Sequence, residues 1–392
     1  MSKKKILVIN NQMELGGVCI AAKNFIENMK FDYDIEFVLA KHSGDLANRL
    51  PEGAKISYIN QPLSYCPLTR KEVKKMGLWH HIKKVFIILI ERFFSSRLIG
   101  KLICKRTPKN KELYDIVINN DMDMTSHYCG ACHLYSKYLV KANKKALVIH
   151  GDFFANNYDT EFFKTEYLST YDIIITLTNY ENERLKQTFP EYRSKFIMVP
   201  NFQAETEIKQ LSVLEDVKFD NSRLNIVSAS RLTEVKGYKR SLEVFKRLKK
   251  EGIEFNWHIL GHGEQFDELL QLIAKYDLSD RVFLYGVKNN PYPFMKMADL
   301  LYLGSYHESY GLVLIESMIL GTPVLTTKTI AAEEIVPEEY GWICDNSQEG
   351  IYSLLKSILS KKTLLEEKKA NLKNYKFDND SIKLKYEEII NR

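Results

Sequence analysis

The feature that most constrains the fold is an alternation of short β-branched runs with longer helical patterns, which occurs twice along the chain. Such runs are typical of parallel strands buried on both faces, and the helical segments between them are the crossovers. Strands are predicted at residues 6–10, 35–40, 116–119, 146–150, 173–178 and 197–200, and again at 224–229, 256–260, 282–285, 300–303 and 323–326.

The length of 392 residues supports two domains rather than one. We predict an N-terminal domain over residues 1–202, a second domain over 203–375, and a C-terminal helix over 376–392 that packs on either domain. A polar stretch at 203–222 is interpreted as the interdomain linker. Both domains are expected to be doubly wound Rossmann-like α/β domains that face each other across a cleft. Ligands of such sheets bind beyond the carboxyl ends of the strands, so the residues that follow each strand are the candidates for function.

Charge is concentrated in a basic insert at about residues 70–111, where 13 Lys or Arg accompany only Glu72 and Glu91. Within it, residues 70–106 combine helically spaced apolar and aromatic residues with lysines and arginines, a pattern that favours an anionic membrane surface. The alternative, a buried helix with a solvated basic edge, stays open. A nucleic-acid partner is disfavoured, because no nucleic-acid-binding motif accompanies the insert.

The apolar run at the start of the chain is too short for a signal peptide, and no apolar stretch is long enough to span a bilayer. The protein is therefore expected in the cytoplasm, with its six cysteines as reduced thiols. Cys129 and Cys132, next to His133, fit the spacing of haem attachment or half a zinc site. We predict packing cysteines instead, with no cofactor and no metal.

The segment at residues 300–327 predicts a strand, a polar turn and a helix that begins near Leu312. The helix amino-terminal amides around Tyr310, Gly311 and Leu312 would form an anion site suited to phosphate. Glu308 lies in the turn and Glu316 inside the apolar helix, where its carboxylate needs a hydroxyl or cationic partner. The alternative is a solvated loop acid and a helix-face acid.

The segment at residues 227–245 places Arg231 and Lys236 between a strand and a helix. An arginine fork and a mobile lysine suit the two halves of a diphosphate, and Gly237 permits close approach of the backbone. The alternative is a pair of surface cations.

Three further loops follow predicted strands. Gly16 and Gly17 open a helix without completing a dinucleotide-binding fingerprint. His150 ends a strand, with Asp152 in the same loop, and Gly261 begins a tight turn. Each has an ordinary structural alternative, a turn or a satisfied histidine.

Together these motifs resemble the retaining glycosyltransferases of family 4, which have the GT-B fold. The resemblance rests on HESYGLVLIE, in which Glu308 and Glu316 are separated by seven residues, and on MILGTPVLTT after it. Arg231 and Lys236 stand where the family has phosphate-binding cations. Gly16 and Gly17, VIHGD around His150, GHGE at 261–264 and AAEEIV at 331–336 also fit.

The resemblance implies roles for these residues. Arg231 and Lys236 would hold the donor diphosphate, with Gly16, Gly17, Gly261 and the amides of Tyr310, Gly311 and Leu312 also in the donor site. Glu316 would bind the ribose hydroxyls, and Glu308 the sugar hydroxyls near the reacting carbon. His150 would lie by the sugar ring. Glu308, His150, Arg231 and Lys236 are thus the predicted catalytic residues.

We therefore expect a retaining, metal-independent glycosyltransferase, peripheral on the inner face of the cell membrane. It would transfer a hexose or N-acetylhexosamine from a nucleotide sugar, UDP-linked, to a lipid-linked saccharide in bacterial surface polysaccharide synthesis. The alternatives are a sugar-nucleotide epimerase on the same fold and a non-catalytic adaptor at the membrane surface.

Overall fold

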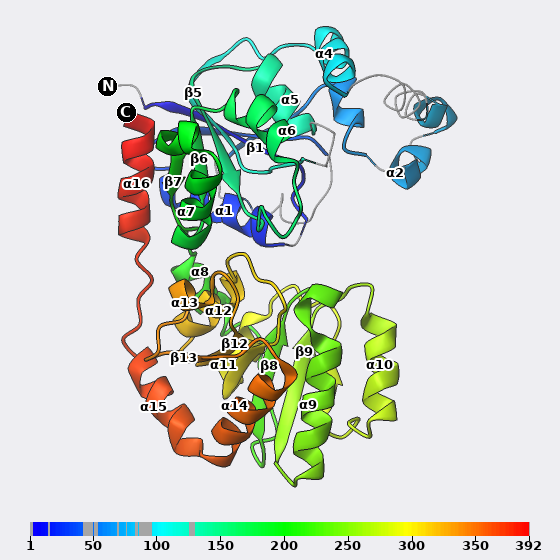
Figure 1. Cartoon of the computed structure of the whole chain (residues 1–392), viewed down its shortest axis with the longest axis vertical. Helices are drawn as coiled ribbons and strands as arrows, with labels where there is room; N and C mark the ends of the chain where they lie inside the picture. Colours follow the sequence, from blue (N-terminus) through cyan, green and yellow to red (C-terminus); the bar gives the residue numbers. More distant parts are fainter. Residues whose placement is uncertain are drawn as a thin grey trace. The chain divides into compact units, whose positions relative to one another are not determined.

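The chain divides into two units in the computed structural model, which describes residues 3–14, 16–41, 50, 54–68, 70–75, 77–82, 85, 96–124 and 130–391. Unit 1 comprises Met1–Phe202 together with Asn379–Arg392, and unit 2 comprises Gln203–Asp378. Each unit contains one parallel sheet with helices on both faces (Figure 1).

The sheet of unit 1 has the strand order β3-β2-β1-β4-β5-β6-β7 over the described residues, and all of its pairs are parallel. Its strands are β1 (Lys5–Asn10), β2 (Asp34–Leu39), β3 (Lys55–Tyr58), β4 (Leu113–Asn119), β5 (Lys141–Ile149), β6 (Ile173–Thr176) and β7 (Phe196–Met198). The helical segments are α1 (Gly17–Met29), η2 (Leu63–Tyr65), α2 (Arg70–Lys75), α4 (Ser96–Arg106), α5 (Ala131–Tyr138), α6 (Thr160–Phe162), η3 (Phe163–Leu168), α7 (Asn179–Thr188), η4 (Pro190–Lys195) and α16 (Asn379–Asn391).

The sheet of unit 2 has the order β10-β9-β8-β11-β12-β13, again entirely parallel. Its strands are β8 (Leu224–Ala229), β9 (Phe255–Leu260), β10 (Val282–Leu284), β11 (Leu300–Leu303), β12 (Val324–Thr327) and β13 (Gly341–Cys344). The helical segments are α8 (Glu205–Leu211), η5 (Glu234–Lys236), α9 (Tyr238–Lys250), α10 (Phe266–Lys275), α11 (Tyr292–Met297), α12 (Leu312–Ile319), α13 (Ala332–Ile335), α14 (Gln348–Ser360) and α15 (Lys362–Leu372).

Each predicted strand has a counterpart, so the predicted fold class is confirmed. The sequence pattern missed two of the four edge strands, β3 and β13, whereas the other two, β7 and β10, were predicted. β3 is largely exposed and β13 is half-buried at both central positions, so neither has the continuous apolar run of a strand covered on both faces. The interpretation of residues 203–222 as a linker is wrong in part, because they include α8, which packs on α11 and α12.

Large aromatic side chains fill the core of unit 2. Trp257 on β9 stacks on Phe245 of α9, with ring centroids 4.2 Å apart, and lies edge-on to Tyr302 of β11. The Trp257 indole donates to Ser228 Oγ at 2.9 Å, so its polar atom is satisfied inside the core. These contacts fix α9 on the sheet, and α9 follows directly on the loop that carries Lys236.

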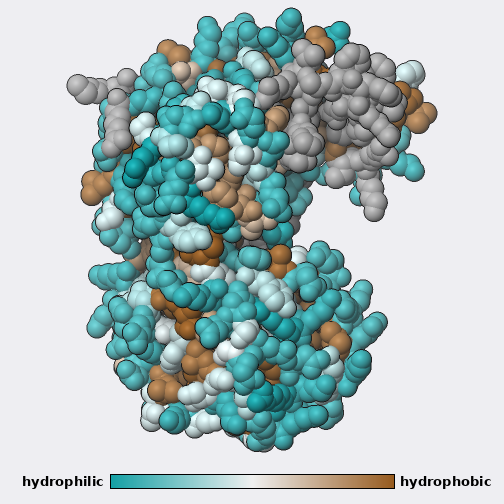
Figure 2. Space-filling model, viewed as in Figure 1, coloured by the Kyte–Doolittle hydropathy of each residue, from teal (hydrophilic) through white to brown (hydrophobic). Residues whose placement is uncertain are grey.

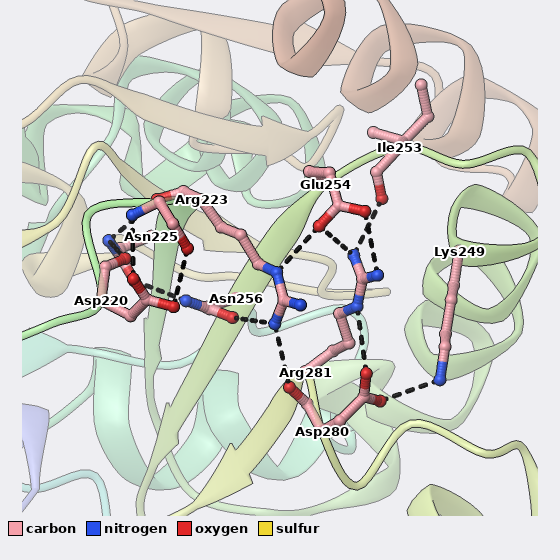
Figure 3. A network of polar contacts seen from close by, with 10 residues as sticks. Asp220, Arg223, Asn225, Lys249, Ile253, Glu254, Asn256, Asp280 and Arg281 are labelled. Carbon is pink, nitrogen blue, oxygen red and sulfur yellow. Dashed lines mark hydrogen bonds and ion pairs between the residues drawn. The ribbon is translucent and has the colours of Figure 1, made fainter.

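An ion-pair network joins the amino ends of β8, β9 and β10 (Figure 3). The Glu254 carboxylate accepts from Arg223 Nε at 2.8 Å and from Arg281 Nη2 at 3.0 Å. Asp280 accepts from Lys249 Nζ at 2.8 Å. Exposed pairs of this kind contribute about 0–1 kcal/mol each, so we assign the network a role in strand alignment. It lies at the end of the sheet opposite the one where ligands of this fold class bind.

The last helix, α16, returns to unit 1 and packs on α1. Tyr386 is buried there, in edge contact with Phe25 at 4.9 Å and stacked on Phe202 at 5.6 Å. Lys383 pairs with Asp32 at 2.6 Å. The structure thus decides which domain the C-terminal helix covers. Among the described residues, no helix is both long and apolar enough to cross a membrane.

Candidate functional site

The candidate site in unit 2 lies at the point where the strand order reverses. β8 and β11 are neighbours in the sheet, but their crossovers run to opposite sides. The loops that leave their carboxyl ends, residues 230–237 and 304–311, therefore lie side by side at the place where ligands of this fold class bind. Arg231, Lys236 and Glu308 all lie in these two loops.

Lys236 and Glu308 form an ion pair, with Lys236 Nζ 2.5 Å from Glu308 Oε2. Both side chains are largely shielded, at 17% and 14% exposed. Ser305 Oγ also donates to Glu308 Oε2, at 3.4 Å. Two residues 72 positions apart are thus held together as a charged pair at the switch point, which excludes the solvated-acid alternative for Glu308.

Gly237 explains how Lys236 reaches this position. The short helix η5 ends at Gly237, whose φ of +67° lies in the left-handed region. A Cβ at this position would lie 2.2 Å from the Gly304 carbonyl oxygen, so the two loops meet backbone to backbone. Only glycine fits this conformation and this approach without strain.

Arg240 is a residue of this site that the sequence analysis missed. Its buried guanidinium donates from Nη2 to Gly304 O at 2.8 Å, to Ser305 O at 3.0 Å and to Asn346 Oδ1 at 2.7 Å. It also stacks on the Tyr306 ring at 3.8 Å. Its acceptors are carbonyl oxygens, so Arg240 holds the Glu308 loop in place and leaves its own positive charge uncompensated by these contacts.

Arg231 differs from Lys236 in being exposed, and its guanidinium has no partner among the described residues. Its position is set by the backbone: the neighbouring Leu232 amide donates to His262 O at 3.0 Å. Gly261, at φ +136°, would place a Cβ 1.9 Å from Ser230 O. The predicted GHGE turn thus packs directly against the Arg231 loop.

The amino end of α12 faces the same edge of the sheet. Gly311 is its N-cap in the left-handed region (φ 79°, ψ 50°), no side chain caps the helix, and its first turn holds no acid. Tyr310 is buried beside it. The amides from Gly311 and Leu312 onward therefore supply the amino-terminal half of a helix dipole, which favours an anion.

Glu316 lies one turn further along α12 and is 6% exposed. The Tyr292 hydroxyl, at the start of α11, donates to Glu316 Oε1 at 3.4 Å. The carboxylate therefore has the hydroxyl partner that it requires, but the hydrogen bond is long and the partner carries no charge. Burial raises the pKa of Glu316 from 4.5 to about 7. A buried carboxylate with so little compensation is suited to accept hydrogen bonds from ligand hydroxyls.

This pKa predicts a pH-dependent stability. Because the folded protein binds the proton more tightly than the unfolded chain, Glu316 lowers the free energy of unfolding as the pH rises from about 4.5 to about 7. We expect Glu316→Gln to be more stable than the parent at pH 8, by about 3 kcal/mol at most, and equal to it at pH 4. Urea unfolding at the two pH values measures this. A variant less stable at pH 8 would contradict the assignment.

The predicted residues of unit 1 lie at its own switch point, between β1 and β4. Gly16 is the N-cap of α1, Gly17 is its first residue, and a Cβ on Gly16 would meet no atom within 4 Å. His150 follows β5. Asn120, which follows β4 and which the sequence analysis missed, links them: it donates to Val18 O at 3.2 Å and accepts from His150 Nε2 at 3.0 Å.

Burial lowers the pKa of His150 to about 4, so its imidazole is neutral at physiological pH. In the same loop, Asp152 Oδ1 accepts from the amides of Phe154 and Ala155 and shapes the turn. Glu181 of α7 accepts from the Phe153 amide at 2.8 Å and ties the same loop to α7.

Of the cysteine motif, Cys132 and His133 are among the described residues. Cys132 is buried in α5, and its amide donates to Asp123 Oδ2 at 2.8 Å. Burial raises the pKa of its thiol well above 9, which agrees with a packing role. Cys129 lies outside the described residues.

Comparison with known proteins gives a consistent result. Residues 212–378 match the family model "Glycosyl transferases group 1". A named N-acetylgalactosaminyltransferase of Campylobacter jejuni, whose acceptor is a saccharide on diphospho-undecaprenol, is 32% identical over 37% of this chain and 40% of its own length. The Escherichia coli putative colanic acid biosynthesis glycosyltransferase WcaL is 33% identical over 32% of this chain and 34% of its own. The matches span less than half the length of these curated relatives.

The whole chain aligns in three dimensions with Anabaena Alr3699/HepE, crystallised with UDP and glucose, at a TM-score of 0.69 and 14% identity over 99% of both chains. At this identity the likeness establishes the fold. The two parallel-sheet units and this likeness together show that the chain has the GT-B fold. Residues 212–378, nearly all of unit 2, match the glycosyltransferase group 1 model, which agrees with the resemblance to glycosyltransferases for this part of the chain.

Proposed function

We propose that the chain is a retaining glycosyltransferase that moves a hexose or N-acetylhexosamine from a UDP-sugar to a lipid-linked saccharide during bacterial surface polysaccharide synthesis. The observation that carries the proposal is the shielded Lys236–Glu308 pair at the switch point of a group 1 domain. The acceptor class is supported by the diphospho-undecaprenol-linked acceptor named for the Campylobacter relative.

Positive charge at the switch point suits the leaving group. Lys236 and Arg231 would bind the donor diphosphate, and the amino end of α12 would stabilise the negative charge that develops as the bond to the sugar breaks. Fixed donors of this kind require no reorganisation during the reaction. With these cations in place, the proposal requires no metal.

The two acids would recognise hydroxyls. Glu308, oriented by Lys236 and Ser305, would accept from sugar hydroxyls near the reacting carbon. Glu316, buried beside Tyr292, would accept from the ribose hydroxyls. For retention, the acceptor hydroxyl would attack on the face that the diphosphate leaves. The anomeric carbon–oxygen bond to the diphosphate breaks, the bond to the acceptor oxygen forms, and the acceptor proton passes to the departing phosphate oxygen.

The direct test is a panel of nucleotide sugars, screened by thermal shift and then by transfer to a polyprenyl-diphosphate saccharide. We expect UDP-sugars to raise the melting temperature and one of them to yield product with retained configuration. Conversion of that donor without acceptor would indicate an epimerase instead. Liposome binding without any nucleotide-dependent shift would indicate an adaptor.

Part of the basic insert fits a membrane surface. Leu78 and Trp79 are 73% and 76% exposed, and Lys74 and Lys75 beside them are exposed too. Hydrophobic residues are visible at the edge of the molecule near α2 (Figure 2). α4 behaves differently: Ile99 and Cys104 are buried, and it packs on α5, which is the buried-helix alternative. Residues 83–84 and 86–95 lie outside the described residues.

We therefore propose that Leu78 and Trp79 insert into an anionic membrane while Lys74 and Lys75 contact the headgroups. The double substitution Leu78→Glu and Trp79→Glu is expected to reduce binding to phosphatidylglycerol vesicles at least tenfold in a sedimentation assay. Leu270→Glu, at a 45% exposed position of unit 2, is the matched control. Equal binding of both variants and the parent would overturn the assignment.

A further inference from the structure

Asn120 connects three segments at the carboxyl edge of the unit 1 sheet. Its side chain is buried, at 6% exposed, and lies between the last residue of β1, the first turn of α1 and His150 after β5. Its Nδ2 donates to Asn10 Oδ1 at 3.3 Å and to Val18 O at 3.2 Å, and its Oδ1 lies 3.0 Å from His150 Nε2. All three polar contacts of this amide are therefore accounted for.

The orientation of these amides is determined by backbone carbonyls, which can only accept. Asn10 Nδ2 donates to Gln12 O at 2.7 Å, so Asn10 presents its oxygen to Asn120. Asn120 must then direct Nδ2 toward Asn10 Oδ1 and Val18 O, and its own oxygen toward His150. Since that oxygen cannot donate, the proton of the contact belongs to His150 Nε2.

A neutral imidazole carries one proton, so a proton on Nε2 leaves Nδ1 as an acceptor. His150 Nδ1 has no partner among the described residues. The neighbouring acids are occupied elsewhere: Asp152 binds its own loop, Glu181 binds the Phe153 amide, and Asp121, whose pKa burial raises to about 6, is bonded by the Asn11 backbone. An unshared acceptor at a ligand-binding edge fits a hydroxyl group.

We propose that Asn120 is a positioning residue that holds His150 in the Nε2–H tautomer, so that Nδ1 accepts a hydrogen bond from a hydroxyl of the saccharide substrate. The hydroxyl partner rests on the proposed function, whereas the tautomer does not. Asn10 and the Val18 carbonyl are the outer members of this series of hydrogen bonds. Through Asn120 they connect the orientation of His150 to the turn at Gly16 and Gly17.

The tautomer is measured by long-range ¹H–¹⁵N NMR on protein labelled with ¹⁵N-histidine at pH 7.5. The His150 signals are assigned by their loss in His150→Gln. We expect a protonated Nε2 and a bare Nδ1. In Asn120→Leu, which is similar in size and cannot accept, this signature should change. His133, buried in α5, is the internal control and should not change. A protonated Nδ1 in the parent protein, or an unchanged signature in Asn120→Leu, would overturn the proposal.

Activity measurements test the contact between His150 and the substrate hydroxyl separately from the tautomer of His150. We expect Asn120→Leu to lower kcat/KM about tenfold, the loss of roughly one hydrogen bond. Asn120→Asp keeps the acceptor but adds a negative charge that favours the imidazolium. It should therefore retain the Nε2 proton and most activity at pH 8, with the acid limb of kcat/KM moved to higher pH. Normal activity of Asn120→Leu would overturn the role in substrate binding. Absence of sugar transfer in the parent protein would refute the proposed function. The tautomer of His150 would still be decided by the NMR measurement.

Discussion

Lys236→Met is expected to lower kcat/KM for sugar transfer by about a hundredfold to a thousandfold, the usual loss when one fixed donor to a developing anion is removed. The charge that leaves with the diphosphate would then be stabilised by the exposed Arg231 and the helix terminus alone. Initial-rate measurements with the donor identified by thermal shift test this. The loss should appear mainly in kcat, because the charge develops in the transition state.

Lys239→Met is the matched control for this experiment. Lys239 lies three residues after Lys236, at the start of α9, and its ammonium group pairs with Glu234 and Glu268 at the surface. We expect transfer within twofold of the parent. Glu308→Gln should also be severely impaired. The double variant Lys236→Met with Glu308→Gln should recover stability lost when Glu308 is left without its cation, but no activity. Full activity of both single variants would refute the catalytic assignment.

Tyr386→Ala is expected to destabilise the protein by about 3–5 kcal/mol, because it removes a fully packed aromatic ring between α16 and unit 1. The cavity would lie between Phe25 and Phe202, which both contact the ring. Urea denaturation followed by tyrosine and tryptophan fluorescence measures the free energy of unfolding. Since two of the three tryptophans, Trp257 and Trp342, lie in unit 2, far-UV circular dichroism should be recorded in parallel.

The control on the same helix is Leu384→Ala, at a position that is 65% exposed. We expect a change within about 0.5 kcal/mol. If both variants unfold like the parent, α16 does not stabilise unit 1. A destabilised Tyr386→Ala protein that still binds donor would show that α16 supports unit 1 without taking part in nucleotide binding.

Most of the architecture was predictable because buried parallel strands need apolar residues on both faces. This requirement produces continuous apolar runs in the sequence, such as those at β1 and β9. Strands β3 and β13 were not predictable, because each is partly exposed to solvent and therefore lacks the continuous apolar run. The packing of α16 was also open, since its apolar stripe would fit either unit.

The site was predictable where chemistry leaves a local pattern. Lys236 beside Gly237, and Glu308 ahead of an uncapped helix, are visible in the chain as residues that follow strands. Arg240 and Asn120 were missed for opposite reasons. Arg240 sits within an amphipathic helix and looks like one more surface cation. Asn120 is one of several asparagines at strand ends, and its partners Asn10 and His150 are 110 and 30 residues away.

The amino-acid sequence by itself determined the two α/β domains and the candidate residues that follow their strands, because burial periodicity and loop chemistry are local properties. Only the tertiary structure decided that Lys236 pairs with Glu308, that Glu316 is buried beside the Tyr292 hydroxyl, and that His150 faces an amide oxygen. Hydrogen bonds and desolvation depend on which distant segments meet, and no local pattern encodes the orientation of an amide or the dielectric around a carboxylate.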